Sequence, residues 1–201
     1  MTNSLTNGGG SKTGLCRAIA GILMGALTAL GLRAPDTGEA WAASPEDTLL
    51  MDLKDGQVVI EMRPDLAPGH VARIKELVRQ GFYDGLTFHR VIRGFMAQTG
   101  DPNGDGTGGS GVKLEAEFSS EPHVRGTLSM ARGTHPDSAD SQFFIVFART
   151  RHLDNQYTVW GRVIDGMEYV GKIKRGADDR NGAVDDPDRI IRLRVSADVK
   201  K

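Results

Sequence analysis

Arg90 and Gln98 are two polar residues of this chain that fall within a largely apolar run. The run covers residues 88–101 and reads FHRVIRGFMAQTGD. A guanidinium group stays charged at any physiological pH and presents a planar fork of several donors. It can use that fork to bind a ligand, or it can lay its apolar stem along neighbouring side chains and keep its head in water. The residue type alone leaves both uses of Arg90 open.

Two later segments repeat this mixture of amide, aromatic and aliphatic side chains. SQFFIVF places Gln142 two residues before Phe144, and HLDNQYTVWG contains Leu153 and Tyr157. Such side chains can line a groove for a peptide or an apolar ligand. Aromatic residues also form ordinary cores, with the polar groups between them facing solvent. Spacing alone does not separate a groove from a core.

Two glycine-rich motifs in residues 101–111 are incomplete. Asp101, Asn103, Asp105 and Gly106 match the opening of an EF-hand loop, but the last ligand position is Val112 instead of glutamate. GTGGSG lacks the Lys-Ser or Lys-Thr pair that completes a phosphate-binding Walker loop. A plain glycine-rich turn explains both fragments better than a calcium or nucleotide site.

The sequence gives little support for metal or hydrolytic chemistry. No two of the five histidines have metal-ligand spacing, and no cysteine follows Cys16. Ser129 and Ser141 lie in or beside strand-like runs without the turn that exposes a nucleophilic serine. We therefore expect no metal, no cofactor and no covalent intermediate.

Composition places further limits on the protein. Of 201 residues, 25 are basic and 26 acidic, giving a net charge of −1. Nucleic-acid binding would require a basic patch or stripe, which this balance does not indicate. With Cys16 as the one cysteine, an intramolecular disulfide is impossible. We expect no nucleic-acid partner and a monomer.

The first 42 residues resemble an export signal. Lys12 and Arg17 precede the apolar stretch AIAGILMGALTALGL at residues 18–32, which is too short to cross a membrane comfortably. Ala40 and Ala42 are small residues suited to signal-peptidase cleavage after Ala42. The expectation is a signal peptide over 1–42, a domain over 43–201, and a periplasmic or secreted protein without membrane contact by the mature domain. A membrane anchor and a buried helix are the alternatives for the first segment.

The candidate site residues must be positioned by a fold. The sequence pattern of residues 43–201 predicts a fold that is mainly β. Residues 48–62 read as two strands joined at Asp55-Gly56, and Val71, Ile74, Leu77 and Val78 have helical spacing, with Gly81 after them. Further strands are expected at 87–92, 96–98, 126–131, 142–147, 158–164 and 189–195, and a short helix at 166–173. Residues 101–111 and 176–188 read as long loops, the second an acidic, exposed connection. Many short strands and two helices indicate an antiparallel barrel or sandwich.

At these residues the sequence resembles the cyclophilin-type peptidyl-prolyl isomerases, in particular their bacterial branch. The matching strings are FHRVIRGFMAQTGD, GTGG, GTLSMAR, SQFFI and LDNQYTVWG, in the family's order, and the resemblance covers residues 48–195. It implies a closed eight-stranded antiparallel β-barrel capped by two α-helices. It also implies an active groove on the outer surface of that barrel.

The resemblance assigns roles to individual positions. It places the catalytic arginine at Arg90, with His89 beside it. It places the proline pocket at Phe95, Met96, Phe144 and Leu153, with Tyr157 also at the site, and the amides that contact the substrate backbone at Gln98 and Gln142. Ala131 and Arg132 match the strand edge that pairs with the peptide, where main-chain groups matter more than side chains.

Four positions depart from the best-known eukaryotic pattern of the family. His152 stands in place of a tryptophan, Tyr157 of a histidine, Trp160 of a phenylalanine near the pocket floor, and Arg132 of an asparagine. The missing tryptophan supplies the indole donor for cyclosporin in sensitive members, so the resemblance does not extend cyclosporin sensitivity to this chain.

The function that the resemblance implies is rotation about Xaa-Pro peptide bonds in folding proteins. The partners are then proline-containing, unfolded or extended polypeptide segments. The alternative is a chaperone that holds such segments in the same groove, with catalysis incidental. A scaffold role is weaker, because a scaffold has no need for an arginine among apolar groove residues.

Overall fold

The computed structural model describes residues 44–200, which form eight strands, two α-helices and five short 3-10 turns. The expected signal segment over 1–42 lies outside the described residues. The strands are β1 (Thr48–Leu53), β2 (Gly56–Met62), β3 (Arg90–Ile92), β4 (Met96–Thr99), β5 (Thr127–Met130), β6 (Phe143–Val146), β7 (Val159–Asp165) and β8 (Arg192–Val195). The helices are α1 (Pro68–Arg79) and α2 (Met167–Val170), and the 3-10 turns are η1 (Pro45–Asp47), η2 (Pro136–Ser138), η3 (Arg151–Leu153), η4 (Asp178–Arg180) and η5 (Ser196–Asp198).

The strands make one antiparallel sheet in the order β3-β4-β6-β5-β7-β2-β1-β8. The expected closed barrel is wrong, because the sheet is open and its edge strands β3 and β8 do not pair with each other. The chain ahead of both edges is irregular, with Gly81 and Gly85 at positive φ before β3 and Asn181, Gly182 and Asp186 at positive φ before β8. That irregular chain supplies an isolated bridge between Thr87 and Arg189 and a few single backbone hydrogen bonds, instead of a ladder.

The first hairpin shows why β1 and β2 form where the sequence predicts them. Side chains alternate between the core and the outside, with Leu49 and Met51 fully buried from β1 and Val58 and Ile60 from β2. The turn lies one residue earlier than expected, at Lys54-Asp55, because Leu53 pairs with Gly56. A Cβ atom on Gly56 would lie 2.5 Å from the Tyr169 ring of α2, so a side chain there would displace that ring.

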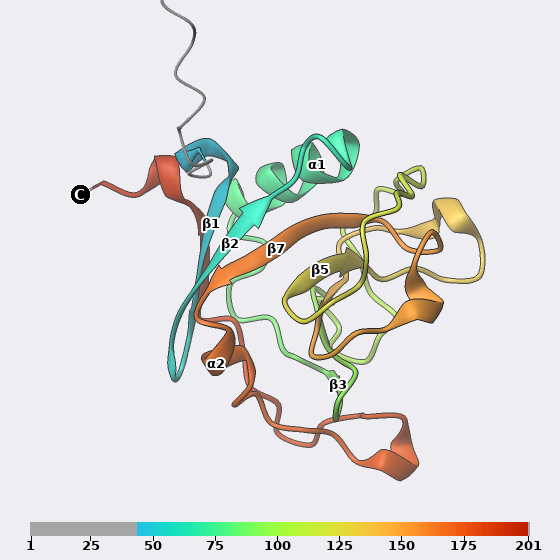
Figure 1. Ribbon diagram of the computed structural model, residues 1–201. Coiled ribbons are helices and arrows are strands. Elements are labelled where there is room, and N and C mark those ends of the chain that lie inside the picture. The colour runs from blue at the N-terminus through green and yellow to red at the C-terminus, as the bar shows by residue number, and fades with distance from the viewer. Residues whose placement is uncertain (1–43, 201) are drawn as a thin grey trace, which may run out of the picture. The chain divides into compact units, whose positions relative to one another are not determined.

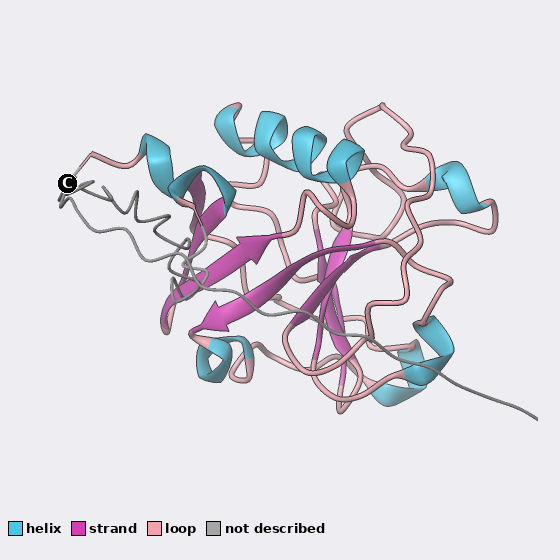
Figure 2. Ribbon diagram, turned by 45° about the horizontal axis from the view of Figure 1, so that its top comes forward, coloured by secondary structure: helices cyan, strands magenta, loops and turns pink. Residues whose placement is uncertain are grey.

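Helix α1 buries the face that its apolar spacing predicts. Pro68 occupies its first turn, where a missing N–H costs nothing, and the buried side chains include Val71, Ile74 and Leu77. No side chain of the helix itself caps this end. Instead Glu117 accepts hydrogen bonds from the backbone N–H groups of Gly69 and His70, each at 3.0 Å. Helices α1 and α2 lie on opposite sides of strands β2 and β7 (Figure 1, Figure 2).

The last turn of α1 holds both ends of the described chain. Arg79 donates to the Glu46 carboxylate of η1 at 2.9 Å, and its Nε atom donates to Asp198 of η5, also at 2.9 Å. Lys75 adds a bond to Asp47 of 2.7 Å. These contacts fix η1 and η5 beside the end of α1.

The buried side chains form two clusters on opposite faces of β4 and β6. Ala97, Phe143 and Ile145 belong to the main core. Met96, Phe144, Val146 and Leu153 form a second, smaller cluster, with Ile92, Phe95, Ala131 and Tyr157 packed against it. Because successive residues of a strand face opposite sides, these strands are buried on both faces. The second cluster is the floor of the groove described next.

Candidate active site

Strand register brings Arg90, Gln98 and Phe144 into one row. Arg90 of β3 pairs with Gln98 of β4, and Gln98 pairs with Phe144 of β6. Directly paired residues of neighbouring strands project to the same face of a sheet. The charged, amide and aromatic side chains that stood out in the sequence are therefore neighbours across three strands.

A chain of side-chain hydrogen bonds runs along this row. Arg90 Nη1 donates to Gln98 Oε1 at 3.1 Å, and Gln98 Nε2 donates to Gln142 Oε1 at 2.9 Å. Gln142 Nε2 donates to the carbonyls of Gly106 and Gly108, at 3.0 and 2.8 Å. Both Nε2 hydrogens of Gln142 are thus engaged, which fixes the orientation of the two amides and the direction of the whole chain.

The Arg90 side chain is partly buried at this face. Burial lowers the pKa of its guanidinium from the ordinary value, a change that leaves the group charged at neutral pH. The fork therefore works as a permanent cation beside apolar walls, where hydrogen bonds are stronger than in water.

Nine of the eleven predicted site residues line one cavity of about 150 Å³. Its walls combine the polar fork and amide with the second apolar cluster: Arg90, Phe95, Met96, Gln98, Ala131, Arg132, Phe144, Leu153 and Tyr157. The rings of Phe144 and Tyr157 meet edge to face, 5.9 Å between centroids. Gln142 lines a neighbouring, more polar cavity of about 200 Å³ that shares Gln98, Ala131 and Arg132 with the first.

His89, the remaining predicted residue, lines a different cavity on the other side of Arg90. That cavity measures about 550 Å³. The imidazole is 7% exposed, and neither ring nitrogen has a hydrogen-bond partner within residues 44–200. Burial lowers the pKa of His89, so the ring is neutral near pH 7.

Two of the departures from the eukaryotic pattern, His152 and Trp160, fall in different environments. His152 is exposed at the pocket rim, its ring 5.7 Å from that of Phe95. Trp160 is not near the pocket floor but fully buried in the main core, edge to face with Phe143 at 5.3 Å. It lies on β7, and its neighbours belong to the core face of the sheet.

The side chain of Arg132 has a larger part than the sequence interpretation gave it. Its Nε and Nη2 atoms donate to the Gln156 carbonyl at 3.1 and 3.0 Å, and Nη1 donates to the carbonyls of Gly133 and Thr134. Its guanidinium carbon lies 4.7 Å from the centroid of the Tyr157 ring. The side chain thereby joins the chain after β5 to the segment that carries Tyr157.

Sequence reasoning missed Asn181, which contacts Arg90 directly. Arg90 Nε donates to the Asn181 backbone carbonyl at 3.1 Å, and Arg90 Nη2 donates to Asn181 Oδ1 at 2.9 Å. Asn181 lies in the stretch that was expected to be only an exposed connection. The Asn-Gly pair at 181–182 signals a tight turn, but nothing local indicates that this turn meets a residue 91 positions away.

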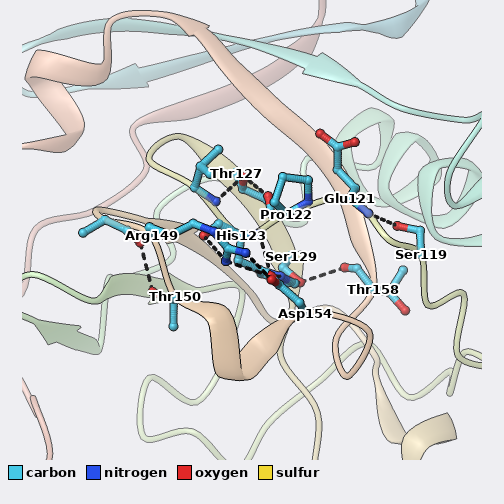
Figure 3. Close-up of polar contacts among 12 residues, drawn as sticks. Ser119, Glu121, Pro122, His123, Thr127, Ser129, Arg149, Thr150, Asp154 and Thr158 are labelled. Carbon is cyan, nitrogen blue, oxygen red and sulfur yellow. Dashed lines mark hydrogen bonds and ion pairs between the residues drawn. The ribbon is translucent and has the colours of Figure 1, made fainter.

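A serine, a histidine and an aspartate also meet in triad order (Figure 3). His123 places Nδ1 3.2 Å from Asp154 Oδ1 and Nε2 3.0 Å from Ser129 Oγ. Ser129 and His123 are both fully buried, and Ser129 Oγ also lies 2.9 Å from the Thr158 carbonyl oxygen. No substrate can reach that hydroxyl. His123 stacks on Phe144 at 6.3 Å, so the network supports the pocket wall.

The calcium-like motif folds as a turn around Asp101. That residue is 1% exposed, and its carboxylate accepts from the backbone N–H groups of Asn103, Asp105 and Gly106. The oxygens therefore point inward and stabilise the loop. In the part of the chain that the structure describes, no group of three or more His, Cys, Asp or Glu side chains could hold a metal ion.

The fold and the groove define the class of protein, a mainly β domain with an arginine at the mouth of an apolar surface pocket. The cyclophilin type peptidyl-prolyl cis-trans isomerase/CLD family matches residues 48–195 of this chain. The chain therefore belongs to the cyclophilin-type peptidyl-prolyl cis-trans isomerases, and it is an isomerase.

Similar proteins agree with this assignment. A Brucella suis protein described as a probable peptidyl-prolyl cis-trans isomerase is 54% identical over 187 residues, which cover 87% of this chain and 94% of that protein. Peptidyl-prolyl cis-trans isomerase B of Bacillus subtilis is 46% identical over 127 residues, covering 62% and 88%.

Solved structures agree as well. A cyclophilin of Hirschia baltica has a TM-score of 0.70 at 27% identity, covering 79% of this chain and 77% of that one. A Cryptosporidium parvum cyclophilin crystallised in the presence of the dipeptide Ala-Pro has a TM-score of 0.68 at 28% identity, covering 74% and 98%.

Proposed function

We propose that the groove binds an extended polypeptide segment with a proline ring in the 150 Å³ pocket, and that Arg90 catalyses rotation of the bond preceding that proline. The observation that carries this proposal is the position of the guanidinium at the mouth of an apolar pocket. Only part of its donor set is used by Gln98 and Asn181. The similar Cryptosporidium parvum structure determined with Ala-Pro supports a proline-containing substrate.

The reaction needs no bond to be made or broken. The amide before proline has partial double-bond character and a rotation barrier of about 18–20 kcal/mol. Twisting removes the resonance and leaves a lone pair on the proline nitrogen, which can then accept a hydrogen bond. An N–H of Arg90 can donate to that nitrogen while another grips a substrate carbonyl. Such bonds lower the barrier only where they favour the twisted state over the planar one.

The apolar walls hold the ring while the preceding carbonyl swings. Phe95, Met96, Phe144 and Leu153 surround the pocket, and Tyr157 closes one side by its contact with Phe144. A turnover on the order of 100–1000 per second would require a barrier lower by roughly 5–7 kcal/mol. A few directed hydrogen bonds and an apolar clamp can supply that amount.

The existing hydrogen bonds restrict how the backbone of the substrate binds. Gln142 has no N–H left to donate, so it contributes an acceptor, Oε1, to a substrate amide. Gln98 keeps one N–H beyond the bond to Gln142. The Ala131 N–H already donates to the Gln142 carbonyl at 2.9 Å, which leaves the main chain of Arg132 as the donor for strand pairing.

A protease-coupled or NMR exchange assay on an Xaa-Pro peptide tests the proposal. We expect Arg90→Ala to remove most of the isomerase activity and to leave the fold intact, because the side chain lies at the surface of the groove. Equal kcat/KM for the wild type and Arg90→Ala would refute the mechanism. Arg162→Ala, an exposed arginine of β7, is the matched control and should keep full activity.

We also propose that the chain is exported and that its substrates are Xaa-Pro segments of proteins folding in the periplasm or beyond it. The basis is the charge, apolar stretch and Ala-x-Ala pattern of residues 1–42. A mature mass starting at Ala43 would support cleavage, and an intact mass in the membrane fraction would contradict it. Within residues 44–200, no helix combines the length and apolar character needed to cross a bilayer.

The groove is assembled from a single chain, and on this basis we propose a monomer. Light scattering coupled to size exclusion should give the mass of one chain. A dimer mass across the working concentration range would contradict this part of the proposal.

A further inference from the structure

We propose that Asn181 is a positioning residue for Arg90, an inference that rests on the proposed role of Arg90 in isomerisation. Asn181 accepts two hydrogen bonds from the edge of the guanidinium formed by Nε and Nη2. Its backbone carbonyl accepts from Nε, and its Oδ1 accepts from Nη2. Gln98 accepts from Nη1. Together these bonds use three of the five N–H groups of the fork. One N–H on each terminal nitrogen is left for a substrate.

The cavity beside Arg90 explains why the guanidinium needs a second hydrogen-bond partner in addition to Gln98. On the side away from the pocket, the guanidinium borders a space of about 550 Å³, which Asn181 itself lines. An arginine side chain has several rotatable bonds, and an unrestrained fork could turn into that space. The bidentate contact with Asn181 keeps the terminal nitrogens at the pocket mouth.

Asn181 is itself held in place by the backbone of its turn. Gly182 donates to the Ala177 carbonyl at 2.9 Å, and its own carbonyl accepts from Val91 N–H at 2.8 Å. Gly176 N–H donates to the Val91 carbonyl at 2.9 Å. The turn is therefore bonded to the edge of β3 through both the N–H and the carbonyl of Val91, the neighbour of Arg90.

Two features keep this turn compact. A Cβ atom on Gly176 would lie 1.8 Å from the Gly182 carbonyl oxygen, so a side chain there cannot be accommodated. Asn181 has φ 52° and ψ 35°, the left-handed conformation that asparagine tolerates better than most residues. The sequence Arg-Asn-Gly at this point thus suits a rigid turn that presents an amide oxygen to Arg90.

The side chain of Asn181 is exposed, and its one hydrogen bond within residues 44–200 goes to Arg90. Exposed side chains with no other contact contribute little to stability. Loss of this side chain should therefore affect the orientation of Arg90 more than the stability of the fold. Orientation matters most where the twisted bond is stabilised, so kcat should change more than KM.

The test uses Asn181→Gly in the full chain, because glycine adopts the left-handed conformation without strain and only the amide is lost. The matched control is Asp186→Gly, a residue of the same connection with φ 50° that does not contact Arg90. We expect kcat/KM on an Xaa-Pro peptide to fall about three- to tenfold for Asn181→Gly, as loss of one net hydrogen bond predicts. KM should change less than twofold, and the Tm values of the two variants should agree.

A double-mutant cycle separates positioning from a general structural effect. In an Arg90→Ala background, Asn181→Gly should cause no further loss of activity, since there is no fork left to position. Asn181→Asp, which keeps an acceptor at Oδ1, should retain more activity than Asn181→Gly. Unchanged kcat for Asn181→Gly, an equal loss for Asp186→Gly, or an equal loss in the Arg90→Ala background would each overturn the proposal. If Arg90→Ala alone is fully active, the proposed function of Arg90 has failed instead.

Discussion

The guanidinium of Arg132 stacks on the ring of Tyr157, with the guanidinium carbon 4.7 Å from the ring centroid. Both residues replace others in the eukaryotic pattern of the family, and here the two replacements contact each other. Arg132 also spans the gap to the Gln156 carbonyl through two donors. One wall of the 150 Å³ cavity therefore depends on an arginine side chain.

Substitution of Arg132 by leucine should weaken substrate binding. A cation–π contact at an exposed site contributes about 0.5–1 kcal/mol, so we expect KM to rise about two- to fivefold with kcat nearly unchanged. Steady-state kinetics on one Xaa-Pro peptide would measure both parameters. Arg162→Leu, on an exposed position of β7, is the control. A fall in kcat at constant KM would show that Arg132 acts on the chemical step instead.

Arg90→Lys should be a poor substitute for the wild type. A lysine cannot satisfy Asn181 and Gln98 together and still present two donors to a substrate, because its ammonium lacks the planar fork. We expect kcat/KM at least about tenfold below wild type. NMR exchange measurements on an Xaa-Pro peptide would check this, and near-wild-type activity would mean that positive charge alone is sufficient.

Asp154→Asn should destabilise the fold from beneath the pocket. The carboxylate accepts from Arg149, from the backbone N–H of His123 and from the His123 ring. Loss of charge-assisted bonds at this position should lower the free energy of unfolding by about 1–3 kcal/mol. Urea denaturation would measure the change, with the exposed Asp179→Asn as the control. Equal midpoints for the two variants would contradict the prediction.

Stability should fall as the pH drops below neutral. Burial lowers the pKa of His123 below its ordinary value of 6.5, despite the opposing effect of Asp154. Between the folded and unfolded pKa values the unfolded chain binds the extra proton, so acid favours unfolding there. His89, whose pKa is also lowered by burial, acts in the same direction.

A second loss should follow at lower pH. The Arg149 guanidinium and the His123 backbone N–H hold the pKa of Asp154 well below its ordinary value of 3.8. Its stabilising contribution is complete above the unfolded pKa and is lost as the pH falls through the folded one. Urea midpoints should be constant above about pH 7 and should decline from about pH 6.5 downward. A His123→Asn variant should flatten the first part of that decline, and an unchanged slope would exclude His123 as its source.

The positions of the strands and of most groove residues could be predicted from the sequence. Alternating burial predicts β1 and β2, and helical spacing predicts α1. The row of Arg90, Gln98 and Phe144 follows from strand register once the strands are paired. The elements follow from local patterns that a sequence displays directly, whereas the groove residues were predicted from the family resemblance, since spacing alone did not separate a groove from a core.

The features that could not be predicted depend on contacts between distant segments. The open sheet results from irregular chain ahead of β3 and β8, and a resemblance to closed barrels does not reveal this. Asn181 reaches Arg90 across 91 positions, and the stack of His123 on Phe144 joins a loop to β6. The family resemblance predicted that Trp160 lies near the pocket floor. In the structure its position on β7 places its side chain in the main core instead.

Arg79 links Glu46 and Asp198, so the described chain enters and leaves the domain at neighbouring points. Those points lie at the far end of the domain from β3, which carries Arg90 (Figure 1). A reporter protein or a surface linkage joined ahead of Ser44 or after Asp198 would leave the groove facing outward. The enzyme could thus be immobilised through either terminus with its groove open to proline-containing peptides.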